Sequence, residues 1–287
     1  MNDTGSTKLA GVVGWPIDHS LSPRLHSHWI EEYRIDAAYV PMAVRCEDFF
    51  TVINGLRLAG FRGVNVTVPH KEAAFALADG RDAAAEIAGA ANLLLFGKNG
   101  IEASNTDGVG FATALVEGLG RDAFKGGPAV IWGAGGMARA AVCALSELGA
   151  SEIRILNRDK ARAVNLVAAL APSTAAKLLC MGFEDWQRAG RDACLLVNAT
   201  SAGMKGADSI DLPLDVLPAD AFVFDAVYNP LETPLLRRAK TRGLRTIDGL
   251  GMLMHQAVPS FAAFIGIEPK VSAALREAME EALRHGR

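Results

Sequence analysis

The amino-acid sequence predicts an α/β protein of two domains, and three observations carry this expectation. Strand and helix patterns alternate along the first part of the chain, and a second alternating run begins near residue 128. The chain of 287 residues, half of them hydrophobic, is also long enough to bury two cores. Such alternation is typical of mostly parallel sheets that are covered by helices.

The N-terminal run reads as strand, helix, strand, helix and strand. Strands are expected over 9–15, 37–44 and 63–68, and helices over 22–35 and 46–60. Ser22 is expected to cap the first helix, with Pro23 at its first position. In the third strand Asn65 and Thr67 are two residues apart and face the same side. Pro69 is expected to turn the chain into a helix that presents Lys71.

The second run has the same character. Strands are expected over 128–132, 152–157, 194–200 and 221–228, and helices over 137–150, 159–170 and 233–243. From Gly249 onward the pattern is helical and offers no strand of its own. This last segment is therefore expected to pack back onto one of the two domains.

Composition excludes several classes of partner. The 29 basic and 32 acidic residues give a formal charge of -3, which provides no general field for nucleic acid or an anionic membrane. No stretch approaches the roughly 18 apolar residues of a membrane span, and the start MNDTGSTKLA lacks the features of a signal peptide. A cytoplasmic location is therefore expected. The cysteines and histidines lack metal-ligand spacing, so no metal site is expected.

A glycine-rich turn predicts dinucleotide binding. In VIWGAGGMARAA a buried strand runs into Gly133, Gly135 and Gly136, and a helix follows directly with Ala138 at the third small position. This G-x-G-x-x-A pattern provides a tight turn, room for a pyrophosphate, and amide groups at a helix N-terminus.

The end of the next strand indicates which dinucleotide binds. An NAD site usually places an acidic residue there, whereas this chain has Asn157 and Arg158, which suit the 2′-phosphate of NADP. Lys160 and Arg162 either add positive charge or form a solvated helix face. Asp159 either faces the ribose or caps the next helix.

Polar clusters are expected at strand ends or in the turns after them. They are Ser20 and Ser22, then Asn65, Thr67 and Lys71, then Asn92, then Asn105, Thr106 and Asp107. Ligands bind beyond the C-terminal ends of parallel strands, so these groups are expected to converge on one cleft. Taken singly, each cluster also has a purely structural explanation, such as a helix cap or a turn. Together they suit a small polyhydroxylated substrate.

The sequence resembles the shikimate dehydrogenase family, which includes the quinate/shikimate dehydrogenases. The resemblance is carried by GWPIDHSLSP, GVNVTVPHKE, NTDGVGF, GAGGMAR, NATSAGM and DGLGMLMHQA, which occur in the family's order from about residue 9 to about residue 266. The family usually reads AVNT where this chain reads AANL, so Leu93 replaces a threonine beside Asn92.

The resemblance implies a fold and an activity. An N-terminal α/β substrate domain is implied over 1–106 with 249–287, and a Rossmann-type NADP-binding domain over 107–248, the last helices returning to the first domain. The implied reaction is the reversible, NADPH-dependent reduction of 3-dehydroshikimate to shikimate in aromatic amino-acid biosynthesis.

The resemblance also implies roles for individual residues. Lys71 and Asp107 match the catalytic pair, in which Asp107 is expected to orient the lysine and keep it protonated. The positions that match substrate-binding residues are Ser20, Ser22, Asn65, Thr67, Asn92, Tyr228 and Gln256. The positions that match the cofactor site are Gly133, Ala134, Gly135, Gly136, Met137, Asn157, Arg158, Arg162, Ala199, Thr200, Ser201, Gly249 and Met252. His70 is interpreted as a neighbour of the site.

Two alternatives remain open at this point. One is an enzyme of the same fold that oxidises quinate with NAD, because Ser20 and Ser22 suit either acid. The other is a regulatory protein that binds a nucleotide without turnover, against which the intact Lys71 and Asp107 argue. In either case the expected partner is a small molecule, and the chain is expected to be a monomer or a homodimer.

Overall fold

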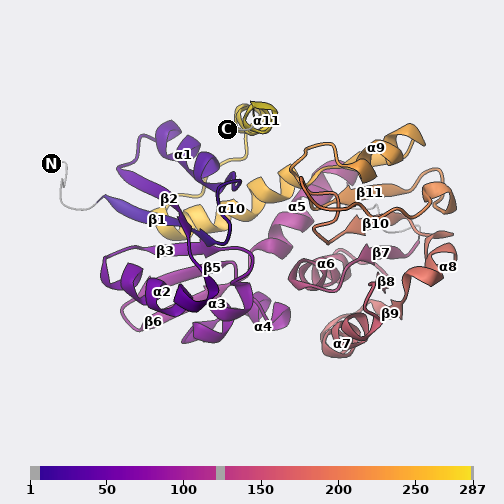
Figure 1. Cartoon of the computed structure of the whole chain (residues 1–287), viewed down its shortest axis with the longest axis horizontal. Coiled ribbons are helices and arrows are strands. Elements are labelled where there is room, and N and C mark those ends of the chain that lie inside the picture. Colours follow the sequence, from indigo (N-terminus) through magenta and orange to yellow (C-terminus); the bar gives the residue numbers. More distant parts are fainter. Residues whose placement is uncertain (1–6, 121–126, 286–287) are drawn as a thin grey trace. The chain divides into compact units, whose positions relative to one another are not determined.

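The computed structural model describes residues 7–120 and 127–285 (Figure 1). The chain forms two compact units. Unit 1 is Met1–Thr106 with Gln256–Arg287, and unit 2 is Asp107–His255. The second boundary expected from the sequence is Gly249, seven residues before Gln256, and the difference arises because one unbroken helix, Gly249–Ile265, runs through both positions. Most of the N-terminal stretch used to argue against a signal peptide lies outside the described residues.

Unit 1 is built on a mixed sheet of order β2-β1-β3-β5-β6-β4. Its elements are β1 Lys8–Gly14, α1 Ser22–Glu32, β2 Ala37–Ala43, α2 Phe49–Leu58, β3 Gly63–Val66, α3 Lys71–Leu77, β4 Gly80–Arg81, α4 Ala83–Ala88, β5 Leu93–Gly97, β6 Gly100–Ser104, α10 Gly249–Ile265 and α11 Ala273–His285. The pairs β1/β2 and β1/β3 are parallel, as expected, and the pair β4/β6 is parallel as well. Strand β5 pairs antiparallel with both β3 and β6, which the alternation of patterns did not predict.

Helices cover both faces of this sheet. On one face Phe49 and Ile53 of α2 and Ala74 of α3 pack onto Val64 and Val66 of β3 in one buried cluster. The residue between those valines therefore points to the opposite face. On that face the rings of Trp29 in α1 and Phe261 in α10 meet edge to face, with centroids 5.2 Å apart.

Unit 2 is a parallel sheet of order β12-β11-β10-β7-β8-β9. Its elements are α5 Asp107–Leu119, β7 Ala129–Trp132, α6 Gly136–Glu147, β8 Glu152–Leu156, α7 Lys160–Leu170, β9 Lys177–Met181, α8 Trp186–Gly190, β10 Leu195–Asn198, β11 Phe222–Asp225, α9 Pro234–Thr241 and β12 Arg245–Ile247. Every pair of neighbouring strands is parallel. This strand order is that of a Rossmann-type fold, as the sequence predicts.

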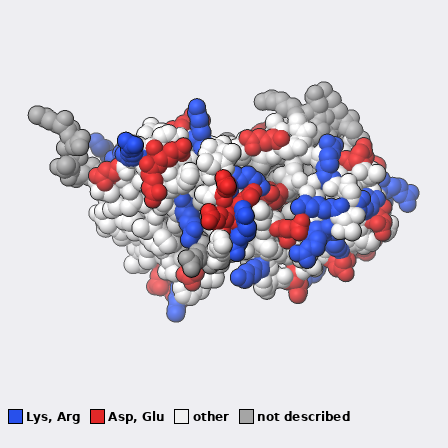
Figure 2. Space-filling model, turned by 90° about the horizontal axis from the view of Figure 1, so that it is seen from above, with Lys and Arg blue, Asp and Glu red and all other residues white. Residues whose placement is uncertain are grey.

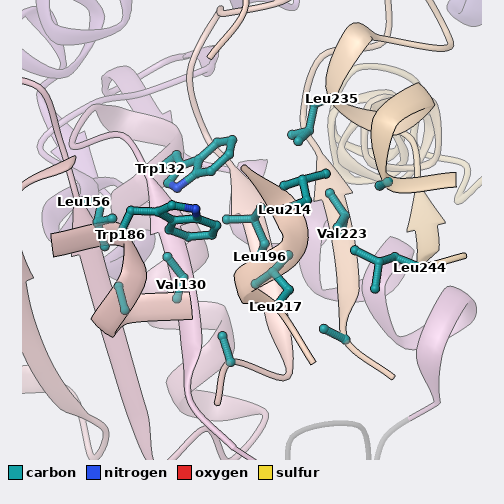
Figure 3. Packing of buried hydrophobic residues seen from close by; sticks show 14 of the residues in the cluster. Val130, Trp132, Leu156, Trp186, Leu196, Leu214, Leu217, Val223, Leu235 and Leu244 are labelled. Carbon is teal, nitrogen blue, oxygen red and sulfur yellow. The ribbon is translucent and has the colours of Figure 1, made fainter. Parts of the chain in front are cut away.

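The core of unit 2 explains how its helices are held. Trp132 of β7 and Trp186 of α8 meet edge to face with centroids 5.2 Å apart, and Leu235 of α9 belongs to the same buried cluster (Figure 3). Phe224 of β11 points the other way and meets Phe111 of α5 at 4.8 Å. Helices α8 and α9 therefore cover one face of the sheet and α5 lies on the other.

The surface carries both signs of charge. On the face shown in Figure 2, basic and acidic side chains lie interspersed, with no broad region of one sign. Among residues 7–120 and 127–285, no helix has both the length and the apolarity that a bilayer crossing requires.

Candidate active site

Strands of both directions bring the polar clusters of unit 1 to one edge of the sheet. Strands β1, β3 and β6 run the same way, so their C-terminal ends share that edge. The sequence predicts Asn92 at the end of a strand or in the turn after one. In the structure it comes directly before β5 instead. Because β5 is antiparallel to β3, its first residues lie at the same edge. The convergence that was expected from parallel strands therefore depends on an antiparallel one.

Asn65 lies on the face of β3 that is covered by α10. Its side-chain amide donates to the backbone oxygen of Asn92 over 3.0 Å and to Ser260 Oγ over 2.8 Å. Its Oδ1 accepts from the Tyr39 hydroxyl over 2.8 Å. Both amide protons of Asn65 are thus used inside the protein, and only one lone pair of Oδ1 stays available.

An aromatic pair stands behind Asn65. The His26 imidazole stacks on Tyr39 with centroids 3.9 Å apart and planes 7° from parallel. Complete burial lowers the pKa of His26 to about 3, so the ring is neutral at physiological pH. The stacked ring leaves Tyr39 little rotational freedom and fixes the direction of its hydrogen bond to Asn65.

Asn92, Thr106 and Gln256 form a second cluster beside the first. The Asn92 amide donates to Thr106 Oγ1 over 2.9 Å and to Gln256 Oε1 over 3.2 Å. The backbone N–H of Thr106 donates back to Asn92 Oδ1 over 2.9 Å. Three predicted substrate residues, Asn65, Asn92 and Gln256, are therefore brought into one network from distant parts of the chain.

Lys71 opens α3 next to this network. Its backbone oxygen accepts from the N–H of Ala91, the residue before Asn92, over 2.9 Å. The helix begins at Lys71, two residues later than the sequence analysis expected, and His70 occupies the N-cap position. His70 is buried, stacks on Phe49, and holds Nε2 2.7 Å from the Val44 oxygen. His70 thus packs into the core of unit 1.

Ser20 lies between β1 and α1, and Ser22 begins α1. Ser22 is the first residue of α1 and not its cap, so that expectation was wrong; Leu21 holds the N-cap position without a side-chain bond. Ser20 Oγ accepts from the Ser22 N–H over 3.3 Å instead. The strand before them, β1, pairs directly with β3, and the Thr67 N–H donates to the Val13 oxygen. Ser20 and Thr67 therefore follow neighbouring strands, and all three hydroxyl residues are half-buried.

Two of the predicted residues that act on substrate belong to unit 2. Asp107 is the first residue of α5 and is 5% exposed. Tyr228 lies in the loop that joins β11 to α9, next to a cis peptide bond between Asn229 and Pro230.

The glycine-rich turn has the conformation that the sequence predicts. Gly133 has a φ of 117°, and a Cβ there would stand 2.9 Å from Thr200 Cγ2 and 3.1 Å from the Ala199 oxygen. Only glycine fits both conditions. A Cβ on Gly135 would meet nothing within 4 Å, so the space above that residue is open. The N-terminus of α6 has no side-chain cap, which leaves its first amides for an anion.

The segment after β8 shows which of the two roles expected for Asp159 applies, contact with the ribose or the cap of the next helix. The Asp159 carboxylate caps α7, because its Oδ1 accepts from the Ala161 N–H over 3.0 Å. The Asn157 side-chain amide donates to the backbone oxygen of Asp159 over 2.8 Å. Arg158 and Arg162 are exposed near the start of α7. Two exposed arginines suit a phosphate better than a ribose hydroxyl, and the adjacent carboxylate serves as a helix cap.

A buried asparagine holds the segment after β10, which contains three of the residues matched to the cofactor site. Asn198 ends β10 and is 1% exposed. Its Oδ1 accepts from both the N–H and the hydroxyl of Thr200, over 3.1 and 2.7 Å. Its amide donates to the Ala202 oxygen over 3.1 Å. Asn198 therefore fixes the path of Ala199, Thr200 and Ser201, the three residues matched to the cofactor site.

The last cofactor positions lie at the start of α10. A Cβ on Gly249 would come within 2.3 Å of the Ala226 oxygen, so the helix begins in close contact with the segment after β11. Met252, one turn later, is buried. Taken together, the open turn, the uncapped helix and the exposed arginines fit a dinucleotide with a 2′-phosphate. Among the residues that the structure describes, no group of three His, Cys, Asp or Glu side chains is arranged for a metal ion.

Several residues of these networks were not predicted as site residues. Thr106 is an exception, because the NTDG motif already placed it with Asp107 in one of the expected polar clusters. Tyr39, Ser260, Asn198 and Asp225 are buried polar residues whose partners lie far away in sequence. Hydrogen-bonded pairs between such distant residues cannot be predicted from a local sequence pattern.

Comparison with protein families gives two matches. Residues 12–94 match the model described as the shikimate dehydrogenase substrate binding domain. Residues 119–204 match the model described as shikimate / quinate 5-dehydrogenase. The two matches fall on unit 1 and unit 2 respectively.

Individual proteins are similar over nearly their whole length. A shikimate dehydrogenase (NADP(+)) of Paramagnetospirillum magneticum is 48% identical over 278 residues, which are 95% of this chain and 98% of the relative. The structure of a shikimate 5-dehydrogenase from Thermus thermophilus in complex with NADP(H) and shikimate has a TM-score of 0.83, 34% identity, and coverage of 98% and 100%. A quinate dehydrogenase from Corynebacterium glutamicum in complex with NAD has a TM-score of 0.86, 30% identity, and coverage of 96% and 99%.

Proposed function

Since this chain belongs to the shikimate dehydrogenase family, we infer that it catalyses the reversible, NADP-dependent interconversion of 3-dehydroshikimate and shikimate. It is then an oxidoreductase that acts on a secondary alcohol. The observation that carries this inference is the network of Asn65, Asn92 and Gln256 beside Lys71. It gathers polar groups at one edge of a sheet, where a polyhydroxylated acid can be held.

We propose that the substrate is held mainly by hydroxyl and amide groups of unit 1. Ser20 and Ser22 at the start of α1 and Thr67 directly after β3 are half-buried and offer hydroxyls to a carboxylate or to ring hydroxyls. Asn92 and Gln256 are fixed against each other and present amides in set directions. For Asn65, only Oδ1 is proposed to reach a substrate hydroxyl, because its amide protons are used. Tyr228 is proposed as the contribution of unit 2.

We propose that Lys71 carries the proton of the reaction. Reduction of the ring ketone creates negative charge on its oxygen, and an ammonium group both stabilises that charge and delivers a proton to it. Lys71 stands at the N-terminus of α3, with its backbone tied to Ala91. Asp107, at the start of α5, is proposed as the acceptor that orients a reacting hydroxyl.

We propose that unit 2 binds NADP. When bound, the cofactor supplies or accepts the hydride. Gly133 to Met137 offer an open turn, and the N-terminus of α6, which has no side-chain cap, offers its first amides to the pyrophosphate, whereas Asn157, Arg158 and Arg162 receive the 2′-phosphate. Ala199 to Ser201, Gly249 and Met252 are proposed to line the cofactor.

The test is a table of initial rates. Shikimate and quinate are each offered with NADP⁺ and with NAD⁺, and formation of the reduced cofactor is followed by its absorbance. The expected result is that shikimate with NADP⁺ gives by far the highest kcat/KM. Binding of shikimate without turnover under any pairing would instead support a regulatory protein.

A second candidate reaction is oxidation of quinate with NAD⁺. It is favoured by the similarity to the quinate dehydrogenase of Corynebacterium glutamicum. The commitment of Asp159 to the cap of α7 argues against it, because an NAD site needs a carboxylate for the ribose. A kcat/KM for quinate and NAD⁺ above that for shikimate and NADP⁺ would establish this alternative.

Other properties stay predictions. These are a cytoplasmic location, action as a monomer or homodimer, and independence from nucleic acid and membranes. Size-exclusion chromatography with light scattering measures the assembly state directly.

A further inference from the structure

Asp225, the last residue of β11, is a fully buried carboxylate that binds three donors. Its Oδ1 accepts from the Asn198 amide over 2.8 Å and from the Val227 N–H over 3.0 Å. Its Oδ2 accepts from the Thr233 hydroxyl over 2.6 Å. The side chain of Thr233 is buried as well. These donors belong to the last residue of β10, to the loop after β11, and to the cap of α9.

Stability alone does not explain a carboxylate at this position. Burial of a charge is costly unless a cation compensates it, and none of the ion pairs found among the described residues involves Asp225. Burial also raises the pKa of Asp225 to about 6, against the effect of its three donors. A carboxylate can, however, accept several hydrogen bonds at the same time, and it thereby holds several donors in fixed directions.

The first segment held by Asp225 is proposed to line the cofactor. Asn198, whose amide is bound by Asp225, also binds Thr200 and Ala202. If Asn198 turns, the N–H and hydroxyl of Thr200 lose their acceptor. The position of Thr200 also limits the space over Gly133. The direction of one buried amide therefore also affects the space over Gly133.

The second segment held by Asp225 carries Tyr228. Val227 and Thr233 anchor the two ends of the loop, and the Lys205 N–H donates to the Asn229 oxygen in its middle over 3.0 Å. The start of α10 lies against the same loop, because Gly249 approaches the Ala226 oxygen closely. The loop is thereby fixed at both ends, and its anchor is the group that also fixes Asn198.

We propose that Asp225 is a positioning residue that locks the 199–202 segment and the 226–233 loop into one unit. The proposal rests on the proposed function, because it takes Thr200 to line the cofactor and Tyr228 to contact substrate. Loss of the carboxylate then weakens cofactor and substrate binding together. The chemical step, which uses other groups, is retained.

Two pairs of variants test this arrangement. Asp225→Asn keeps the shape but gives the Thr233 hydroxyl an amide in place of an acceptor. Thr233→Val removes the same hydrogen bond from the other side, whereas Thr233→Ser keeps the hydroxyl and also the cap of α9, where the Leu236 N–H donates to Thr233 Oγ1. Ile153→Val, in the core of β8, is the control for a destabilised unit 2 with intact loops.

The measurements separate binding from turnover. Calorimetric titration gives the Kd for NADP⁺ without shikimate, and steady-state rates give kcat and the KM for shikimate. We expect Asp225→Asn to raise both the Kd and the KM about tenfold, the size associated with one hydrogen bond to a charged group, with kcat changed less than about threefold. Thr233→Val is expected to follow it, and Thr233→Ser to restore values near those of the wild type.

Each outcome decides the proposal. Unchanged Kd and KM in folded Asp225→Asn, or equal changes in Ile153→Val, would overturn it. Should Asp225→Asn fail to fold by circular dichroism, the contrast between Thr233→Val and Thr233→Ser decides in the same way. A wild type that binds NADP⁺ without oxidising shikimate contradicts the proposed function, whereas the locking of the loops is then judged by the Kd for NADP⁺ alone.

Discussion

Asn92 and Thr106 hold each other through reciprocal hydrogen bonds. The Asn92 amide donates to Thr106 Oγ1 over 2.9 Å, and the Thr106 N–H donates to Asn92 Oδ1 over 2.9 Å. A freely rotating asparagine can present either its oxygen or its nitrogen to a ligand. Here the backbone N–H of Thr106 requires the oxygen on its own side, so the orientation of the Asn92 amide is set before any substrate arrives.

Replacement of Thr106 by valine is expected to weaken substrate binding more than turnover. The variant keeps the shape and the backbone bond but loses the hydroxyl that accepts from Asn92, at a cost of about 0.5–1.5 kcal/mol for one hydrogen bond, while the Asn92 amide still donates to Gln256. We expect the KM for shikimate to rise about tenfold. Thr106→Ser keeps the hydroxyl and serves as the control. Steady-state kinetics of the two variants make the comparison, and equal KM values would contradict the role given to Thr106.

Replacement of Lys71 by alanine is expected to act on turnover. Groups that transfer protons typically contribute about 10²–10⁴-fold to a rate. We therefore expect kcat to fall at least about 10²-fold, while the KM for shikimate changes much less. Lys98→Ala, in an exposed turn of the same unit, is the matched control. A Lys71→Ala enzyme with the kcat of the wild type would rule out the lysine as the proton donor.

Arg158 is expected to separate NADP from NAD. Its side chain is exposed beside the start of α7, and the carboxylate of the adjacent Asp159 is bound to the helix. Arg158→Ala should raise the KM for NADP⁺ by about tenfold or more and leave that for NAD⁺ nearly unchanged. Arg191→Ala removes an exposed arginine elsewhere in unit 2 and should alter neither value. Equal losses for the two cofactors would show that Arg158 does not read the 2′-phosphate.

Local patterns in the sequence were sufficient to predict much of this fold. The period of hydrophobic residues placed β1, β3, β7 and β8, and the strand, glycine turn and helix around Gly133 identified the cofactor domain. These features depend on residues that are close together in the chain. The cap of α7 by Asp159 was one of two interpretations, and only the side-chain geometry decided between them.

The rest of the site depends on long-range contacts that one sequence does not reveal. The direction of β5, which brings Asn92 to the right edge, follows from its pairing with β3 and not from its own residues. Asn65 looked like a substrate ligand because it is polar within a strand. Its amide protons are in fact used by Asn92 and by Ser260, which lies 195 residues away along the chain.

Replacement of Gly133 by alanine is expected to damage unit 2. The left-handed φ of 117° costs an ordinary residue at least about 1–2 kcal/mol, and the new Cβ would press on Thr200 at 2.9 Å. We expect a lower melting temperature and a large loss of NADP⁺ affinity. Gly55→Ala, in α2 with open space around it, should instead raise stability by about 0.5–1 kcal/mol. Thermal unfolding of the two variants tests this prediction, and their melting temperatures should shift in opposite directions from that of the wild type.

Asp225 is expected to make the stability of the chain depend on pH. Its folded pKa of about 6 lies above the ordinary value of 3.8, mainly because burial disfavours the charged form. The folded state therefore binds the proton more tightly than the unfolded state does. The stabilising contribution is complete below about pH 4 and is lost as the pH rises through about 6. The difference between the folded pKa of about 6 and the ordinary value of 3.8 corresponds to about 3 kcal/mol in the free energy of unfolding.

Asp225→Asn is neutral at every pH and isolates this effect. The free energy of unfolding of the variant, measured by denaturant titration relative to the wild type, should rise by about 3 kcal/mol between pH 4 and pH 7. Other titrating groups cancel in the comparison, because both proteins contain them. A difference that stays constant with pH would mean that the Asp225 carboxylate is not destabilised by its burial. Its three donors would then compensate the charge fully, and retention of an aspartate there would be explained by stability rather than by the positions of the two loops.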